Sequence, residues 1–285
     1  MKRPNELEKD VQSTSTLVQL TSVFESLASM QIAKVKNEVL QSQQFFDKLW
    51  QIYTQIRVDS IFHFGRRLNQ GQVSEKELFI VITAEGGFSG DIDQKLIKWM
   101  LGKFNKDKND IIVVGHHGAV QLAQNGVGYK RYFKLPSKDK NINVAPIIKE
   151  VQSYATTKVF YQQYVSLMVQ DVKSISLSGM VEEKGGGVGK SDEIISEETY
   201  IFEPSTFEVI DHLERTMLQI ALSQVILESK LAQYASRFRA MGAAHQRADE
   251  SHADFVLQYN RAKRAVKDER LREIINGLKL SRGAV

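Results

Sequence analysis

Cysteine is absent from the 285-residue sequence, and proline is rare. Without cysteine the chain can form no disulfide framework, no cysteine-ligated zinc or iron–sulfur site, and no thiol nucleophile. The prolines are Pro4, Pro136, Pro146 and Pro204, so a long stretch at each end of the chain contains nothing that interrupts a helix. We therefore expect two long terminal helices.

Long apolar runs are absent as well. No stretch approaches the roughly 18 apolar residues that cross a bilayer. The first ten residues mix basic and acidic side chains, unlike a secretory signal or a transit peptide. The net charge of +4 is too small to indicate nucleic-acid binding. We therefore expect a bacterial cytoplasmic protein that neither spans a membrane nor binds nucleic acid.

The stretch after Pro204 has the pattern of a long coiled-coil helix. Ser205 and Glu208 have the spacing of a capping box, in which each side chain satisfies a free backbone donor. Alternating steps of three and four residues from Ile210 to Val266 pass through 17 positions, of which 14 are apolar. Such a 3.5-residue repeat keeps one stripe on a partner only if the helices supercoil. We predict a helix that continues to Gly277, a natural stop.

The N-terminal stretch carries a weaker version of this pattern and is the expected partner helix. Since about 140 residues of different character separate the two stretches, an antiparallel hairpin is the simplest arrangement. Two histidines, His245 and His252, also fall on the second seam, where polar residues that set the register are favoured over a metal pair. The predicted seam positions are Leu17, Leu20, Phe24, Leu27, Phe45, Leu49, Ile52 and Ile56 on the first helix, and Leu231, Tyr234, Phe238, Met241, Phe255 and Tyr259 on the second.

The residues between the two stretches alternate between strand and helix patterns. The predicted elements are a strand at 78–83, a helix at 94–104, a strand at 111–115, a short helix at 119–123, a helix at 145–156, and one or two strands at 159–177. This alternation predicts a parallel sheet. The expected fold class is therefore a central Rossmann-like α/β domain (69–203) with a long antiparallel coiled coil of the N-terminal (1–68) and C-terminal (204–285) helices.

Three motifs invite a chemical interpretation, and each has a simpler one. The loop at 185–191 resembles a phosphate loop, but Lys184 stands where that motif needs its first glycine, and acidic residues follow. The turn at 86–90 follows a strand but lacks the dinucleotide fingerprint, and two aspartates beside it oppose a pyrophosphate. Adjacent imidazoles such as His116 and His117 rarely share one metal. We predict no catalytic residue, cofactor or metal.

The turn itself carries a resemblance to a known family. The run Ile82-Thr83-Ala84-Glu85-Gly86-Gly87-Phe88-Ser89-Gly90-Asp91-Ile92-Asp93 resembles the motif I-T-S-D-[RK]-G-L-C-G-G-[FLA]-N of F-type ATP synthase γ subunits, and Thr83, Gly87 and Gly90 match it. Residues 237–241 are similar to the family's R-M-x-A-M, and residues 259–265 to its Y-N-x-x-R-Q-A. Residues 11–24 resemble its N-terminal motif. The resemblance covers essentially the whole chain.

The resemblance implies a rotor without an active site of its own. The coiled coil would stand inside the ring of α and β subunits, and the α/β domain would lie with the ε subunit on the membrane ring of c subunits. Such a subunit is peripheral, at the cytoplasmic face of the bacterial plasma membrane. A tip that includes Leu278, Leu280 and Val285 would turn in an apolar sleeve.

The C-terminal stretch is also basic. From residue 230 to residue 285 there are 12 Lys or Arg against 6 Asp or Glu. This bias suggests an acidic partner surface, although a solvated helix face is the commoner explanation. In the light of the resemblance, we expect Lys263, Arg264 and Arg270 to meet acidic loops of the β subunit.

Three other functions remain open. Lys263-Arg264 replaces the family's Arg-Gln pair, which leaves a γ-like shaft of a specialised F-like ATPase not used for synthesis as one alternative. A coiled-coil adaptor has the same fold but assembles no rotary ring. An enzyme that uses a nucleotide in the α/β domain requires that this domain bind one.

Overall fold

A computed structural model describes residues 3–55, 74–137, 139, 142–177, 179, 201, 203 and 205–282. Its elements, in order, are α1 (Pro4–Gln55), β1 (Glu77–Ile82), α2 (Ile92–Leu101), β2 (Asn109–Val114), α3 (His116–Gln124), β3 (Arg131–Phe133), α4 (Ala145–Val151), β4 (Thr157–Tyr164), β5 (Gln170–Ser176) and α6 (Thr206–Arg282). The predicted fold class, an α/β sheet with long terminal helices, is confirmed. Among the described helices, none combines the length and apolarity needed to cross a membrane.

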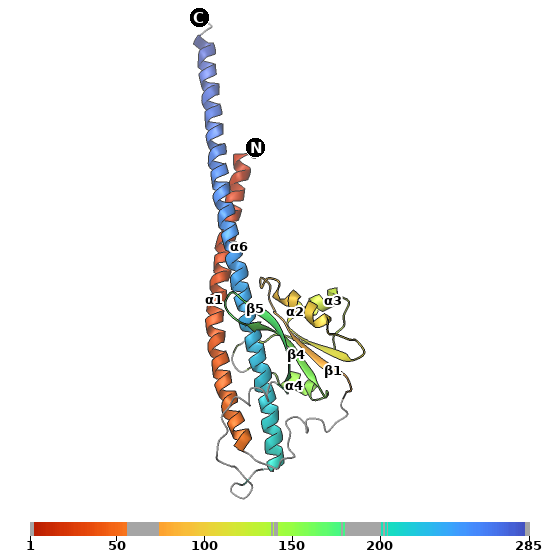
Figure 1. Ribbon diagram of the computed structural model, residues 1–285. Coiled ribbons are helices and arrows are strands. Elements are labelled where there is room, and N and C mark those ends of the chain that lie inside the picture. The colour runs from red at the N-terminus through yellow and green to blue at the C-terminus, as the bar shows by residue number, and fades with distance from the viewer. Residues whose placement is uncertain are drawn as a thin grey trace. The chain divides into compact units, whose positions relative to one another are not determined.

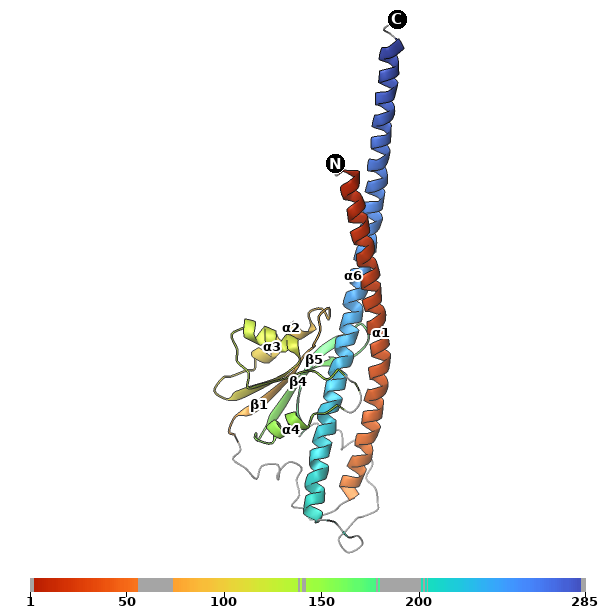
Figure 2. The same ribbon diagram turned by 180° about the vertical axis from the view of Figure 1, so that it is seen from behind.

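Contacts divide the chain into two units, and each long helix contributes to both. One unit joins residues 1–27 to residues 238–285, and the other comprises residues 28–237. Within each unit α1 and α6 lie side by side and run in opposite directions (Figures 1 and 2). The predicted division at 68/69 and 203/204 stays a prediction, because those boundaries fall in or beside segments outside the described residues.

The sheet has five strands in the order β3-β2-β1-β4-β5 (Figure 1). All neighbouring strands are parallel except β4 and β5, which are antiparallel. The central strand, β1, is buried from Leu78 to Ile82 because both faces of the sheet are covered. This double burial explains its continuous apolar run, which is typical of parallel sheets.

Successive side chains of β1 point to opposite faces and enter two separate cores. Leu78, Ile80 and Ile82 pack in a core with α4, with α6 between residues 217 and 226, and with Phe46 of α1. Phe79 and Val81 pack in the other core with α2 and α3. One face of the sheet therefore rests on the helix pair of this unit.

Several element boundaries differ from the prediction. Strand β3 was not expected, because it has only three residues and lies at the sheet edge with two of them exposed. Helix α6 continues through Gly277 to Arg282. A glycine stop needs a positive φ, and Gly277 is not among the residues with that conformation. At the other end, Ser205 Oγ accepts a hydrogen bond from the Glu208 backbone nitrogen at 3.3 Å, which confirms this half of the capping box.

The seam of α1 differs by one residue from the predicted register over its first half. Leu17, Leu20 and Leu27 expose between 44% and 52% of their surface, so the prediction is wrong for these residues. Phe24 is half-buried, and Phe45 and Ile52 are exposed; Ile56 lies outside the described residues. One stripe of buried or half-buried positions follows steps of four and three: Leu7, Val11, Thr14, Val18, Thr21, Glu25, Ala28, Ile32, Val35, Val39, Ser42, Phe46, Leu49 and Tyr53.

Polar side chains on this seam explain the difference. Thr14 Oγ1 lies 3.1 Å from His252 Nδ1, and Glu25 Oε2 lies 3.6 Å from His245 Nδ1. Both histidines therefore contact α1. Thr14 and Glu25 face inward, whereas a seam chosen by apolar residues alone places neighbouring leucines there instead. Along α6, the predicted seam residues from Ile210 to Ala262 are all buried or half-buried.

Adjacent phenylalanines in α1 provide a test of the observed register. Phe46 is fully buried, whereas Phe45 is 54% exposed. We expect Phe46→Ala to lower the free energy of unfolding by about 3–5 kcal/mol because it leaves a cavity. Phe45→Ala is expected to cost less than about 0.5 kcal/mol. Urea unfolding followed by circular dichroism measures both, and equal losses would contradict the register.

Candidate functional site

The candidate site lies where the strand order of the sheet reverses. From β1 the chain proceeds to β2 and β3 on one side, and then returns to β4 and β5 on the other. In open α/β sheets, ligands bind at such a point, in the crevice outside the carboxyl ends of the strands. Here that crevice adjoins the ends of β1 and β4 and the turn of residues 83–91.

Thr83 fixes the start of this turn to α3. Its buried Oγ1 lies 3.2 Å from the carbonyl oxygens of Val114 and Gly115 and accepts a hydrogen bond from the Gly118 backbone nitrogen at 2.9 Å. Gly115 has φ of 104°, and a Cβ there would lie 2.1 Å from the Thr83 carbonyl oxygen. Thr83 therefore braces the sheet edge from inside rather than facing a partner.

The two glycines of the matched motif have different surroundings. Gly90 has φ of 67°, a conformation that favours glycine, and Phe88 shares this φ although it has a side chain. A Cβ at Gly87 would meet no atom within 4 Å, so space alone does not require glycine there. The role of Gly87 that the structure shows is its carbonyl oxygen, which α6 binds.

Asp93, the second residue of α2, holds three parts of the fold together. Its buried carboxylate accepts hydrogen bonds from the Ala84 backbone nitrogen at 3.3 Å and from Gln162 Nε2 of β4 at 2.6 Å. The third partner is His117 Nδ1 of α3, at 2.9 Å. The hydrogen bond that the Asp93 carboxylate accepts is the main cause that raises the pKa of His117, and burial opposes it. The charge of Glu85 also raises this pKa, and the charge of Arg237 lowers it.

Helix α6 fills the crevice from the other side. Ser229 Oγ donates a hydrogen bond to Gln162 Oε1, and Gln233 Nε2 lies 3.3 Å from the same oxygen. Gln233 Nε2 also donates to Ser229 Oγ at 3.0 Å. All three side chains are buried. The carboxyl end of β4 is thus linked to the chain's own C-terminal helix.

The same helix also binds the turn after β1. Arg237 Nε donates to the Gly87 carbonyl and Arg237 Nη2 to the Gly86 carbonyl, each at 3.1 Å. Ser236 Oγ donates to the Ser89 carbonyl at 2.7 Å. The motif at the turn and the motif at residues 237–241, which lie about 150 residues apart, therefore form one contact. The polar residues at 229, 233 and 236 are spaced by four and three, so they share one face of the helix. This spacing was the signal in the sequence that α6 has a second contact surface besides its seam.

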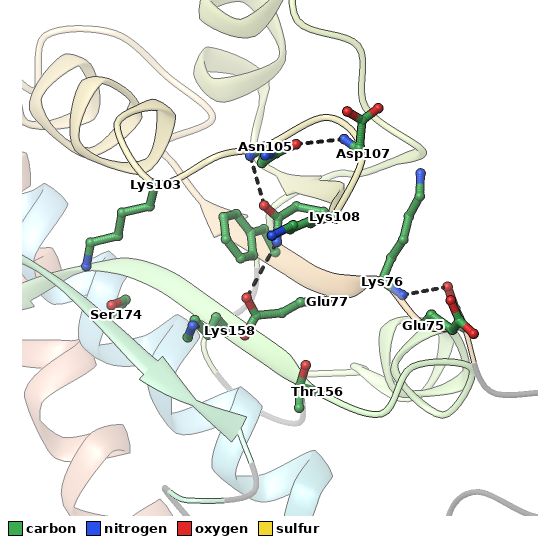
Figure 3. A pocket seen from close by; sticks show the side chains of 13 residues that line it. Glu75, Lys76, Glu77, Lys103, Asn105, Asp107, Lys108, Thr156, Lys158 and Ser174 are labelled. Atoms are coloured by element: carbon green, nitrogen blue, oxygen red, sulfur yellow. Dashed lines mark hydrogen bonds and ion pairs between the residues drawn. The ribbon is translucent and has the colours of Figure 1, made fainter.

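A second hollow lies at the opposite edge of the sheet (Figure 3). This open cavity of about 1150 Å³ adjoins the amino ends of β1 and β2. Some of its charges are paired: Lys158 Nζ lies 3.0 Å from Glu77 Oε1 within the cavity lining, and Lys76 Nζ lies 3.2 Å from Asp110 Oδ1. No group of three or more metal-ligating side chains occurs in the described part of the chain. The absence of a cofactor stays a prediction.

The remaining predicted site residues lie toward the end of α6. Lys263, Arg264 and Arg270 are exposed, and Lys263 Nζ lies 5.4 Å above the Tyr259 ring. Leu278 is exposed, whereas the side chain of Leu280 and all of Val285 lie outside the described part of the structure. The loop at 185–191 also lies outside it.

Comparison with known proteins gives one family. A family model described as ATP synthase matches residues 4–279. The ATP synthase gamma chain of Geobacter metallireducens is 24% identical, covering 97% of this chain and 98% of the relative. That of Chlorobium phaeobacteroides is 25% identical and covers 96% of each chain.

Solved structures share the fold. A chain of the Euglena gracilis mitochondrial ATP synthase, from its OSCP/F1/c-ring structure, has a TM-score of 0.66 at 14% identity and covers 98% of this chain and 96% of that one. A chain of the Tetrahymena thermophila central stalk and c-ring structure has a TM-score of 0.57 at 15% identity, over 79% of this chain and 99% of that one.

The His117–Asp93 contact predicts a pH-dependent stability. Because the folded pKa of His117 is raised above the unfolded value of about 6.5, its stabilising contribution is complete below that value and is lost as pH rises through the folded pKa. We expect the stability difference between wild type and His117→Gln to shrink from pH 5.5 to pH 9. Urea unfolding at several pH values measures it, with His116→Gln as the control. A difference independent of pH would refute this assignment.

Proposed function

The chain belongs to the F-type ATP synthase γ subunit family, and on this premise we propose that it is the central rotor shaft of such an enzyme. The expected family is thereby confirmed. In this role the chain transmits torque between a membrane c ring and a catalytic ring of α and β subunits. The complex uses that torque in proton-driven ATP synthesis or in ATP hydrolysis.

One observation carries the proposal that this subunit is non-catalytic. The crevice in which a doubly wound sheet binds its ligand is filled by α6 side chains. Gln162 and Asp93 have bonded partners there, and Arg237 binds the carbonyls of the adjacent turn. The polar groups of the crevice thus bind other groups of the same chain rather than a ligand. Such bonds connect α6 to the α/β domain, as the transmission of torque between them requires.

The end of α6 suits a shaft that turns inside another protein. In the unit formed with residues 1–27, α6 extends past the N-terminal end of α1 (Figures 1 and 2). The last buried position is Ala262 among the residues whose side chains are described. Beyond it, several large apolar side chains are exposed: Leu271, Ile274, Ile275 and Leu278. An apolar sleeve around them, extending to Leu280 and Val285, is part of the proposal.

The proposed partners follow from this role. They are the α and β subunits around the coiled coil, and the ε subunit and c ring at the α/β domain. The solved relatives come from F1/c-ring and central stalk/c-ring structures, which supports this assignment. The subunit would be peripheral, at the cytoplasmic face of the bacterial plasma membrane.

Co-expression with α and β subunits from the same genome tests the function. We expect one copy of the chain per complex on sizing, and ATP turnover that depends on its presence. The matched control is the complex prepared without this chain. Failure to assemble, with a well-folded solitary chain, would instead favour a coiled-coil adaptor.

The exposed basic residues near the end of α6 give a sharper test. We expect the charge reversals Lys263→Glu, Arg264→Glu and Arg270→Glu together to weaken coupling, because acidic β-subunit loops would then face like charges. ATP-driven rotation under load measures the effect. Reversal of three exposed lysines on the α/β domain, Lys98, Lys106 and Lys149, is the control. Unchanged rotation in the first variant means that these residues are not the contact.

A γ-like shaft of a specialised ATPase is the second candidate. The observation that favours it is Lys263-Arg264 in place of the family's Arg-Gln pair. A complex that hydrolyses ATP but makes none under an ion gradient would support this candidate over a synthase.

A further inference from the structure

A buried lysine on α6 is paired with a buried aspartate from the segment between β3 and α4. The Lys230 side chain is 3% exposed and the Asp139 side chain 1% exposed. Lys230 Nζ donates to Asp139 Oδ1, and also to the Pro136 carbonyl at 2.9 Å. The other carboxylate oxygen, Oδ2, lies 3.2 Å from Lys34 Nζ of α1. One carboxylate thus links α1, α6 and the α/β domain.

The pair is buried between an apolar cluster and a hollow whose lining is partly polar. Val35 of α1 and Leu227 and Leu231 of α6 form a small buried cluster beside it in sequence, with Ile142 and Tyr164 of the α/β domain packed against them. A buried charge without a partner in such a place is strongly unfavourable. A buried ion pair, by contrast, contributes little net stability compared with apolar residues of similar size. Stability alone therefore does not account for the pair.

A role in setting the orientation of α6 explains the ion pair better. Ser229 and Lys230 are neighbours on α6 and project about 100° apart around the helix axis, because a helix has 3.6 residues per turn. Ser229 binds Gln162 of β4, while Lys230 binds Asp139. Rotation of α6 about its axis, or a slip along it, would break at least one of these contacts and, where it separates Lys230 from Asp139, would weaken the pairing of two buried charges.

We propose that Asp139 and Lys230 form an ionic lock that fixes the rotational register of α6 against the sheet. Lys34 of α1, whose side chain is 55% exposed, is an outer partner of the same carboxylate. Asp139 is a positioning residue: it holds α6 in one orientation. The register itself does not depend on the rotor function. Its consequence for torque rests on the proposed function, since a shaft that twists within its own subunit loses part of each rotation.

Spin labels on the full-length chain test the lock directly. Because the sequence has no cysteine, labels can be attached at Lys149→Cys on α4 and His212→Cys on α6, both exposed positions in the same unit. We expect one narrow distance distribution in the otherwise unchanged chain. The double variant Asp139→Leu with Lys230→Met should show a broadened distribution or a second distance. A distribution identical to that of the unchanged chain would overturn the proposal.

Two further variants keep the test decisive. Asp91→Asn with Lys95→Met removes a largely exposed ion pair at the start of α2, away from both labels, and should leave the distribution narrow. If the lock variant fails to fold, Asp139→Asn with Lys230→Met removes both charges and the Lys230 donor at similar side-chain volumes. This variant should also broaden the distribution, and a narrow one there would overturn the lock.

Measurement in the assembled complex then separates the lock from the rotor role. With the lock variant, we expect ATP hydrolysis to continue while fewer protons are pumped per ATP and the shaft twists further under load. Unchanged coupling despite a broadened distance distribution would refute the link to torque but not the lock. Absence of any complex with the unchanged chain would refute the proposed function, while the spin-label result still decides the lock.

Discussion

Burial of α6 on several sides between Met217 and Ser236 is the constraint on which the rest of the structure depends. One stripe of the helix meets α1, and another packs on the sheet through Met217, Leu222 and Ile226. Polar residues in this stretch are acceptable only if they are bonded, since an unpaired buried polar group is costly. Ser229 and Lys230 are each bonded to a different element, so the polar groups specify which surface each face of the helix meets.

The sequence predicted those features that rest on local periodicity. The repeat along α6, the alternation of strand and helix, and the cap at Ser205 all depend on neighbours within a few turns. The register of α1 failed because inward positions hold Thr14 and Glu25, whose partners are histidines more than 200 residues away. Apolarity alone could not identify these positions, since pairing between distant side chains made them favourable.

The candidate site shows the same division. Each family motif could be recognised from its own residues, but their meeting through Arg237 and the carbonyls of Gly86 and Gly87 could not. Backbone carbonyls carry no sequence signature, so their acceptor role appears only in three dimensions. Asp93 is a further example. Its place at the start of a helix suggested only that it would repel a phosphate. In the fold its carboxylate joins the turn, His117 and β4.

The unequal lengths of α1 and α6 give one continuous helix two very different local stabilities. Around Leu222 the backbone amides can exchange with solvent only when much of the fold opens, because side chains on both sides must separate first. Around Ile274 no second helix is present among the described residues, and an isolated segment of this length is marginal in water. Fraying there is a local event. When a binding partner encloses this end of α6, the end loses conformational entropy. That loss lowers the affinity of assembly.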